Sequence, residues 1–151
     1  MCSVPAPPDS GVRMISIVIP AYNYAAYLPA AIDSVLAQQL DELEIIVCDD
    51  ASTDDTPQIV AAYQEQYPCI RVERNPVNLG AVLNINRAVS LAQGDFVLVL
   101  GADDYLLPGA LKALKQALDV HPGCAYAFGR YNIEGADGQI YPLQHPGWLA
   151  N

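Results

Sequence analysis

The sequence has few positively charged residues and few charges altogether. Lysine and arginine together number 7 against 17 aspartate and glutamate residues, and charged residues make up 16% of the chain. The resulting net charge of −10 repels phosphate backbones, so nucleic acid is not expected as a partner. An anionic small ligand would need a cation or a local cluster of amide donors. A hydrophobic fraction of 52% excludes intrinsic disorder over most of the length.

Cysteine motifs and long apolar runs are also lacking. The 4 cysteines lie far apart without a Cys-x-x-Cys pair, which gives no support to a structural zinc site or a disulfide framework. No apolar run approaches the roughly 18 residues of a membrane-spanning helix, so we expect no membrane segment in this chain. Residues 1–12 lack the basic and apolar regions of a signal peptide and are predicted to be a disordered, proline-rich leader. The expected compartment is the cytoplasm.

Short β-branched runs alternate with helical patterns along the rest of the chain. The predicted strands are 15–19, 44–48, 70–73, 96–100 and 125–128. Helices are predicted around 28–36, 56–63, 82–92 and 111–118, with Thr56 as an N-cap and Gly94 as a C′ residue. The apolar stripe of the third helix is formed by Val82, Ile85, Val89 and Ala92.

This alternation of uniformly apolar strands with helices predicts an α/β fold. Such strands form a parallel sheet that is covered by helices on both faces. Residues 13–151 show no internal repeat or linker, so we expect one domain. The stretch 133–151 ends without closing an element, and we expect the chain to be part of something longer.

Polar residues gather where three of the predicted strands end, at 20–23, 49–53 and 103–104. Each cluster alone has an ordinary structural explanation: Asn23 can turn a loop, Ser52 can cap a helix, and acidic residues often follow strands. The carboxyl ends of parallel strands share one edge of a sheet, however, and ligands bind there. The three clusters together therefore predict a ligand site.

Four segments resemble the family 2 glycosyltransferases of GT-A fold, in the family's order. They are SIVIPAYN at 16–23, LEIIVCDDASTD at 43–54, NLG at 78–80 and AQGDFVLVLGADD at 92–104. The resemblance runs over residues 15–118. It implies that 13–151 is the nucleotide-sugar-binding part of a GT-A domain with a Rossmann-like, mostly parallel sheet. It also implies transfer of sugar from a nucleotide-diphosphate sugar, a UDP-sugar, to an acceptor hydroxyl with inversion.

The resemblance also implies a set of nucleotide-binding residues. They are Pro20, Ala21, Tyr22, Asn23, Asp50, Asn78, Gly80 and Asp103. The ring of Tyr22 would stack on the base, and Asp50 would accept the base's N–H, which favours uracil or thymine. Asp49 would instead position the loop.

Asp103 and Asp104 resemble the family's DxD-type metal motif, which implies Mn²⁺ or Mg²⁺ as cofactor. A diphosphate brought beside carboxylates is repelled, at about 4 kcal/mol per unit contact near 4 Å, and a bridging cation reverses that sign. This chain departs from the family because Gly101 stands where an aspartate is common. Arg87 is a further cation that could contact phosphate, although a solvated helix face is the commoner location for such a residue.

The sequence offers no convincing catalytic base. The family places an acid well beyond the metal motif, where it deprotonates the acceptor. Glu134 and Asp137 lie in a Gly-rich stretch and are better explained as hairpin-turn residues. We therefore expect the base and the acceptor half to lie beyond this chain, and the isolated chain to bind nucleotide without transferring sugar. A carbohydrate, a lipid-linked molecule or a protein could be the acceptor, and exposed apolar surface should give weak self-association.

Three other functions are compatible with parts of the pattern. The run IVCDD at 46–50 resembles the acidic pocket of receiver-type phosphoacceptor domains, but that fold needs a basic residue at a later strand end, whereas Lys112 and Lys115 lie in the predicted fourth helix. A dinucleotide oxidoreductase is disfavoured because no Gly-x-Gly-x-x-Gly follows the first strand. A non-catalytic relative that only binds a nucleotide-sugar is the third alternative, and Gly101 keeps it open.

Overall fold

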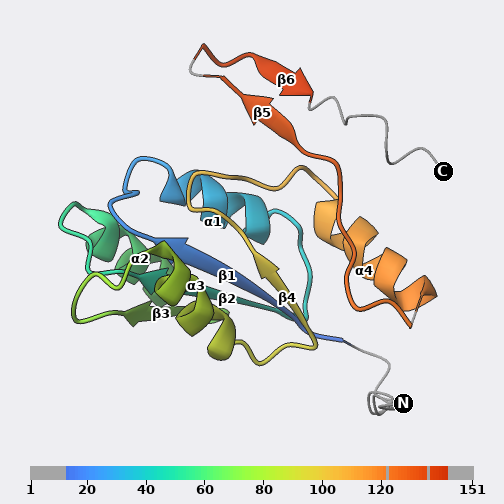
Figure 1. The fold of residues 1–151 in the computed structure, drawn as a ribbon, viewed down its shortest axis with the longest axis horizontal. Helices are drawn as coiled ribbons and strands as arrows, with labels where there is room; N and C mark the ends of the chain where they lie inside the picture. The colour runs from blue at the N-terminus through green and yellow to red at the C-terminus, as the bar shows by residue number, and fades with distance from the viewer. Residues whose placement is uncertain (1–12, 122, 136, 143–151) are drawn as a thin grey trace. The chain divides into compact units, whose positions relative to one another are not determined.

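The computed structural model describes residues 13–121, 123–135 and 137–142 (Figure 1). The helices and strands of these residues are β1 (Ile15–Ala21), α1 (Leu28–Leu36), β2 (Leu43–Asp49), α2 (Thr56–Gln66), β3 (Ile70–Arg74), α3 (Ala81–Ser90), β4 (Phe96–Val99), α4 (Ala110–Val120), β5 (Asn132–Glu134) and β6 (Ile140–Pro142). The chain divides into two compact units after Pro108, with α4, β5 and β6 in the second. The predicted leader lies outside the described residues.

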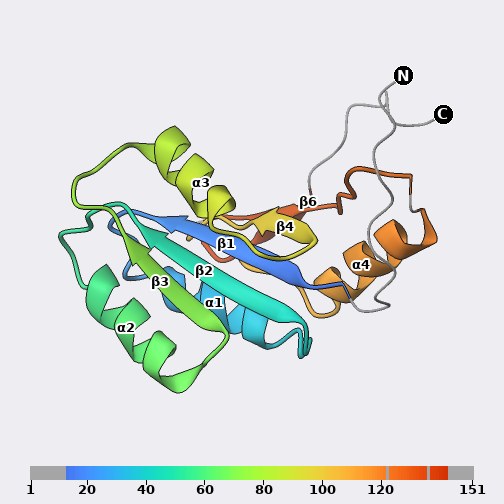
Figure 2. The same ribbon diagram turned by 90° about the horizontal axis from the view of Figure 1, so that it is seen from below.

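Four strands of the first unit form one parallel sheet in the order β3-β2-β1-β4. Helices α1 and α2 cover one face of this sheet, and α3 covers the other (Figure 2). The strand order reverses at β1, because the connection from β3 through α3 leads back across the sheet to β4. This sheet confirms the predicted α/β class with parallel strands and helices on both faces.

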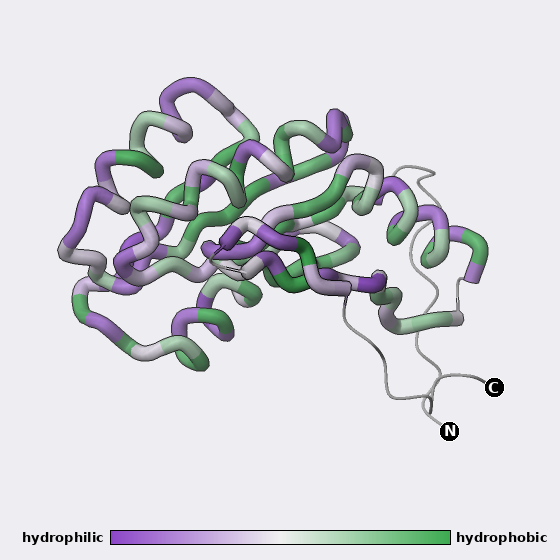
Figure 3. Tube along the Cα trace, turned by 90° about the horizontal axis from the view of Figure 1, so that it is seen from above, coloured by the Kyte–Doolittle hydropathy of each residue, from purple (hydrophilic) through white to green (hydrophobic). Residues whose placement is uncertain are grey.

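The centre of the sheet is apolar on both sides. Ile17 and Val18 in β1, and Ile45 and Ile46 in β2, are completely buried. Since side chains alternate along a strand, successive residues face opposite helix layers. The strands are accordingly among the most hydrophobic parts of the trace (Figure 3), and this double burial explains the continuous apolar runs of the sequence.

The two predicted helix boundaries are wrong. α2 begins at Thr56 with Asp55 in the N-cap position, and the Asp55 side chain forms no capping hydrogen bond. The Thr56 hydroxyl instead accepts a hydrogen bond from another loop. α3 ends at Ser90 with Leu91 as C-cap, so Gly94 is not its C′ residue. A Cβ at Gly94 would lie 2.8 Å from the carbonyl oxygen of Met14, so this glycine is required by the close approach of two backbones.

The predicted apolar stripe of α3 is also offset from the face that is buried. Val82 is 71% exposed and Val89 is 39% exposed, whereas Asn84 and Ala88 are buried. A buried asparagine is stable only where its carboxamide finds partners, and the partners of Asn84 lie outside the helix, in Asn75 and Cys48. Hydrophobic spacing within the helix therefore could not predict its orientation.

In the second unit, α4 follows the prediction but residues 125–128 do not form a strand. Strands β5 and β6 pair antiparallel as a hairpin instead. Glu134 is the last residue of β5, and the Oδ1 atom of Asp137 accepts the Gln139 N–H at 3.0 Å within the turn. The turn role predicted for Asp137 is confirmed. Across both units, no helix of the described residues is long and apolar enough to cross a membrane.

Candidate functional site

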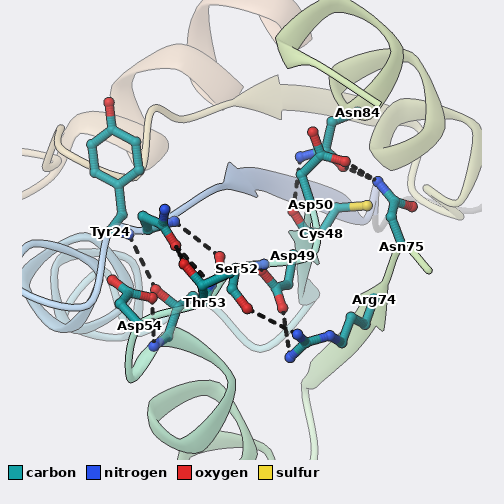
Figure 4. A network of polar contacts seen from close by, with 12 residues as sticks. Tyr24, Cys48, Asp49, Asp50, Ser52, Thr53, Asp54, Arg74, Asn75 and Asn84 are labelled. Carbon is teal, nitrogen blue, oxygen red and sulfur yellow. Dashed lines mark hydrogen bonds and ion pairs between the residues drawn. The ribbon is translucent and has the colours of Figure 1, made fainter. Parts of the chain in front are cut away.

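Strands β1, β2 and β3 end side by side at one edge of the sheet. The register pairs Ala21 with Asp49, and Asp49 with Arg74. The loops that follow these strands therefore meet, and their polar side chains form the network drawn in Figure 4. β4 is shorter: Val99 pairs with Val18, so residues 101–104 continue toward the same edge. The sheet thus brings together the clusters that the sequence predicted.

Asn23 joins the loop after β1 to the loop after β2. Its backbone N–H donates to the Ser52 hydroxyl at 2.9 Å, and its Oδ1 accepts the Thr53 N–H at 2.8 Å. Asn23 has φ +58° and Ala51 has φ +60°, the left-handed region that asparagine tolerates better than most residues. The Oδ1 atom of Asn23 thus shapes the loops, and the nucleotide contact that the resemblance implies for Asn23 stays a prediction.

Asp54 forms a second clamp between the same two loops. Its Oδ2 accepts the Ala25 N–H and its Oδ1 accepts the Thr56 N–H, both at 3.0 Å, while the Thr56 hydroxyl accepts the Tyr24 N–H at 3.1 Å. Burial raises the pKa of Asp54, but the hydrogen bonds from Thr56 and Ala25 lower the pKa by more than burial raises it, so the net shift is downward. The sequence analysis did not assign Asp54 a role. The only sequence signal for this role is that Asp54 lies two residues before Thr56, because an aspartate side chain can accept the backbone N–H two residues further on.

Asp49 and Arg74 both contact the loop that follows β2. Asp49 is 1% exposed; its Oδ1 accepts the Ser52 N–H at 3.0 Å, and its Oδ2 lies 3.2 Å from Arg74 Nη1. Arg74 Nη2 donates to the Ser52 carbonyl oxygen at 2.9 Å. Asp49 therefore positions the loop, as expected. Arg74, at the end of a weakly predicted strand, was missed because its partners lie 22 or more residues away.

Asp50 is 2% exposed and accepts hydrogen bonds from the segment between β3 and α3. Its Oδ1 accepts from Asn75 Nδ2 at 2.7 Å and from the Leu79 N–H at 2.9 Å, and its Oδ2 accepts the Gly80 N–H at 2.9 Å. A carboxylate has about four acceptor sites, so one remains on Oδ2. Burial raises the pKa of Asp50, but these hydrogen bonds lower it by more, and the carboxylate is ionised at neutral pH.

Asn78 and Gly80 form the turn that leads into α3. The Gly80 N–H donates to Asn78 Oδ1 at 2.8 Å as well as to Asp50, and Gly80 has φ +84°, which favours glycine. Behind this turn, Asn75 donates to Asn84 Oδ1 at 2.9 Å, and Asn84 Nδ2 donates to the Cys48 carbonyl oxygen at 2.9 Å. Neither Asn75 nor Asn84 is part of a motif that the sequence pattern predicts as functional.

Asp103 and Asp104 are exposed on a turn closed by the Asp104 N–H, which donates to the Gly101 carbonyl oxygen at 3.0 Å. A Cβ at Gly101 would lie 2.7 Å from Asp104 Oδ2 and 3.1 Å from Asp103 Oδ1. Both carboxylates thus fold over Gly101, in space that an aspartate there would occupy. No group of three or more potential metal ligands exists in the described residues. Two adjacent carboxylates fit Mg²⁺ or Mn²⁺, which complete their coordination with water and substrate phosphate.

The remaining predicted residues occupy the same edge or lie away from it. Pro20 and Ala21 end β1, and Tyr22 follows with 42% of its surface exposed. Arg87 directs Nη2 to Glu73 Oε2 on β3, at 3.9 Å. The guanidinium of Arg87 is thus engaged between α3 and β3, which weakens the case for a phosphate contact.

Comparison with known proteins identifies relatives of the chain. Residues 16–150 match the family model described as Glycosyl transferase family 2. The chain is 39% identical over 137 residues to a hyaluronan synthase of Pasteurella multocida, covering 87% of this chain and 14% of the synthase. It is 30% identical over 129 residues to glycosyltransferase GlyG of Streptococcus pneumoniae, covering 85% of this chain and 43% of GlyG. The chain therefore spans less than half the length of these curated relatives.

The chain is also similar to solved structures. TarS of S. aureus matches with TM-score 0.67 and 33% identity over 72% of this chain and 32% of that chain, in a structure that contains UDP-GlcNAc. Mannosyltransferase PcManGT of Pyrobaculum calidifontis, in complex with GDP-Man and Mn²⁺, matches with TM-score 0.66 and 27% identity over 70% of this chain and 32% of that chain. The receiver-type and oxidoreductase alternatives are thereby removed. The chain belongs to glycosyltransferase family 2 and has its GT-A type of sheet.

Proposed function

We propose that this chain binds the UDP-sugar donor of a metal-dependent, inverting glycosyltransferase that transfers the sugar to an acceptor hydroxyl. The observation that carries the proposal is the convergence at one edge of a parallel sheet of Tyr22, Asp50 and the Asp103–Asp104 turn. Ligands bind at this edge in open α/β sheets. Support also comes from the relatives, since TarS has been solved with UDP-GlcNAc.

The base would bind between Tyr22 and Asp50. The partly exposed ring of Tyr22 can stack on a flat base. The acceptor site left on Asp50 Oδ2 can take one N–H, and uracil presents one N–H between two carbonyl groups. Backbone groups of Pro20 and Ala21 would contact the ribose or base from the end of β1.

Asp103 and Asp104 would hold the divalent cation, Mn²⁺ or Mg²⁺. A net charge of −10 makes diphosphate binding unfavourable without a cation. At an effective dielectric near 20, each unit repulsion at about 4 Å costs about 4 kcal/mol, and two such contacts cancel the ~8 kcal/mol of a micromolar binder. When bound, the metal supplies charge stabilisation of the departing diphosphate. Gly101 leaves both carboxylates free of a third acidic neighbour.

The acceptor side is proposed to come from residues outside this chain. Asp137 is engaged in a hairpin turn, and the chain spans 14% to 43% of the relatives described above. The isolated chain should therefore bind nucleotide but transfer no sugar to a carbohydrate, lipid-linked or protein acceptor. Val97 and Val99 on β4 are 44% and 45% exposed, which supports weak self-association. The cytoplasmic location remains a prediction.

Calorimetry with UDP tests the proposal. We expect UDP to bind in MnCl₂ and to lose most of its affinity in EDTA, with GDP binding more weakly. Asp103→Ala and Asp104→Ala should flatten the difference between MnCl₂ and EDTA. Glu42→Gln is the matched control, because it removes one exposed negative charge at the opposite end of the sheet. Equal UDP affinity with and without metal would remove the metal role, and no UDP binding in either condition would contradict the function.

Catalysis needs a separate experiment. The chain is incubated with MnCl₂, a panel of nucleotide-sugars and candidate acceptors, and products are read by mass spectrometry. Loss of both a general base, worth about 10²–10⁴-fold, and reactant positioning should leave at most slow hydrolysis of the donor. Efficient glycosylated product would show that the base lies within these 151 residues.

A further inference from the structure

Asn75 links the Asp50 carboxylate to α3. It follows β3 directly and is 1% exposed. Its Nδ2 donates to Asp50 Oδ1 at 2.7 Å and to Asn84 Oδ1 at 2.9 Å. The Oδ1 atom of Asn75 is buried and has no partner among the described residues. Asn75 therefore acts on its surroundings only as a donor.

The neighbours fix the orientation of this carboxamide. Rotation by 180° would place Asn75 Oδ1 against two oxygen acceptors, from Asp50 and Asn84. Asn84 cannot adapt, because its Nδ2 donates to the Cys48 carbonyl oxygen at 2.9 Å. The chain of hydrogen bonds from α3 to Asp50 thus has only one arrangement that satisfies its donors.

This arrangement decides which part of Asp50 is free. Asn75 and Leu79 occupy both acceptor sites of Oδ1, and the Gly80 N–H occupies one site of Oδ2. The remaining acceptor site lies on Oδ2. Without Asn75, only the Leu79 and Gly80 N–H groups would hold the carboxylate, whose χ2 torsion is soft and would be less firmly fixed.

We propose that Asn75 is a positioning residue for nucleotide binding: it fixes the rotation of the Asp50 carboxylate so that Oδ2 is presented to the N–H of the base. The inference rests on the role given to Asp50 under Proposed function. The hydrogen bond from Asn75 also helps to lower the pKa of Asp50 against the effect of burial. Asn75 thereby favours the ionised form of Asp50 and directs its carboxylate.

A double-mutant cycle tests whether Asn75 acts through Asp50. UDP affinity in MnCl₂ is measured by calorimetry for Asn75→Ala, Asp50→Asn and the double variant. We expect Asn75→Ala to weaken binding about tenfold in the natural background and less than about twofold in the Asp50→Asn background. Equal losses in both backgrounds would overturn the proposal.

Asn84→Ala is the matched control, because it cuts the same network but keeps the bond from Asn75 to Asp50. It should lower the free energy of unfolding while UDP affinity stays within about threefold. If Asn84→Ala and Asn75→Ala weaken UDP binding equally, Asn75 is merely structural. A lack of UDP binding by the unaltered chain would instead contradict the proposed function. Unchanged affinity in Asp50→Asn would remove the base role of Asp50, and with it the role of Asn75.

Asn75→Asp keeps the size of the side chain and provides a second readout. When ionised, the new carboxylate repels Asp50; when protonated, its O–H donates to Asp50 as the amide did. The ratio of variant to unaltered Kd should therefore fall as the pH is lowered from about 8 to about 5. Asn132→Asp, the same change at an exposed position of β5, should give a constant ratio. A constant ratio for Asn75→Asp would overturn the proposal. This test does not depend on whether the Asn75→Ala variant folds.

Other groups near Asp50 do not produce this pH dependence. Asp49 is paired with Arg74 at 3.2 Å, and Glu73 lies 3.9 Å from Arg87. Burial raises the pKa of the Cys48 thiol, which stays neutral over this range. These groups are the same in both proteins, so their titration cancels in the ratio.

Discussion

The two ends of the parallel sheet both carry networks of polar side chains, but they differ in which hydrogen-bonding groups those networks leave free. At the amino end, Glu44 Oε1 accepts hydrogen bonds from the Ser16 hydroxyl and from the Gln93 N–H, and the Gly94 N–H donates to the Ser16 hydroxyl at 2.8 Å. These contacts join β1, β2 and the loop before β4. At the carboxyl end, Asp50 receives three internal hydrogen bonds and still keeps one acceptor site.

The backbone shows the same difference only in part. Among the described non-glycine residues with positive φ, Gln39 lies in the loop that leads to the amino end of β2, whereas Asn23 and Ala51 lie in loops at the carboxyl end. Such conformations cost energy and tend to occur at functional sites. The exposed Tyr22, Asp103 and Asp104 also lie there. A polar network therefore does not identify a site by itself; the spare acceptor and the exposed groups beside it do.

The largest expected effect is at the amino end and concerns stability alone. A Cβ at Gly94 would lie 2.8 Å from the Met14 carbonyl oxygen and 2.8 Å from the Ser16 nitrogen, so Gly94→Ala forces the backbone to move. We expect a loss of about 3 kcal/mol in urea unfolding, with UDP affinity unchanged in the folded fraction. Gly123→Ala, where the added carbon meets open space, is the control. A stable Gly94→Ala variant that binds UDP poorly would erase the distinction between the two ends.

The next effect separates the groups of the carboxyl end from one another. Asp50→Ala should weaken UDP binding by about 2 kcal/mol with its metal dependence intact, because an N–H of the base is left unpaired. Asp103→Ala or Asp104→Ala should instead abolish the response to MnCl₂. Calorimetry with MnCl₂ and with EDTA measures both quantities. The assignment is reversed if Asp50→Ala removes the metal response and the other two variants keep it.

A smaller loss of stability is expected when Asn23, which joins the loops after β1 and β2, is replaced. Asn23→Gly keeps the left-handed backbone but removes the acceptor of the Thr53 N–H, and should cost about 1 kcal/mol of stability. Asn23→Ala should cost about 1 kcal/mol more, because alanine does not favour this conformation. Thermal unfolding compares the two variants. If they are equally stable, the positive φ carries no strain.

The smallest expected effect is the loss, at acidic pH, of the stability that the ionised Asp50 contributes. The pKa of Asp50 lies below its ordinary value of 3.8, so its contribution to stability is complete above that value and is lost as pH falls through the lower, folded-state pKa. The unaltered chain should therefore lose its stability advantage over Asp50→Asn on acidification. Urea unfolding of both proteins at a series of acidic pH values measures it. An advantage that grows in acid would contradict the shift.

The sequence predicted those features that depend on local pattern and on the geometry of parallel sheets. The four strands of the sheet and the clusters at 20–23 and 49–53 follow from apolar runs that end in polar residues, whereas the loop role of Asp49 was implied by the family resemblance. Asn84 could not be found this way, because its burial depends on partners in β2 and in the segment after β3. Gly94 was assigned to a helix end, while its actual constraint is the backbone of β1.

The second unit also shows that a local sequence pattern does not determine whether a strand forms. The apolar run at 125–128 predicted a strand, but a strand needs a partner, and Tyr126 and Phe128 are 75% and 69% exposed. The hairpin formed instead, where turn residues bring β5 and β6 together. Local turn chemistry was the stronger signal here.

Amide chemical-shift mapping of the ¹⁵N-labelled chain with UDP and Mg²⁺ tests the central claim most directly. The account predicts shifts at 20–24, 49–54, 75–80 and 101–104, the carboxyl end of the sheet, and none at 42–44 or 93–95, the amino end. Shifts confined to the amino end, or none at the carboxyl end with saturating UDP, would contradict it.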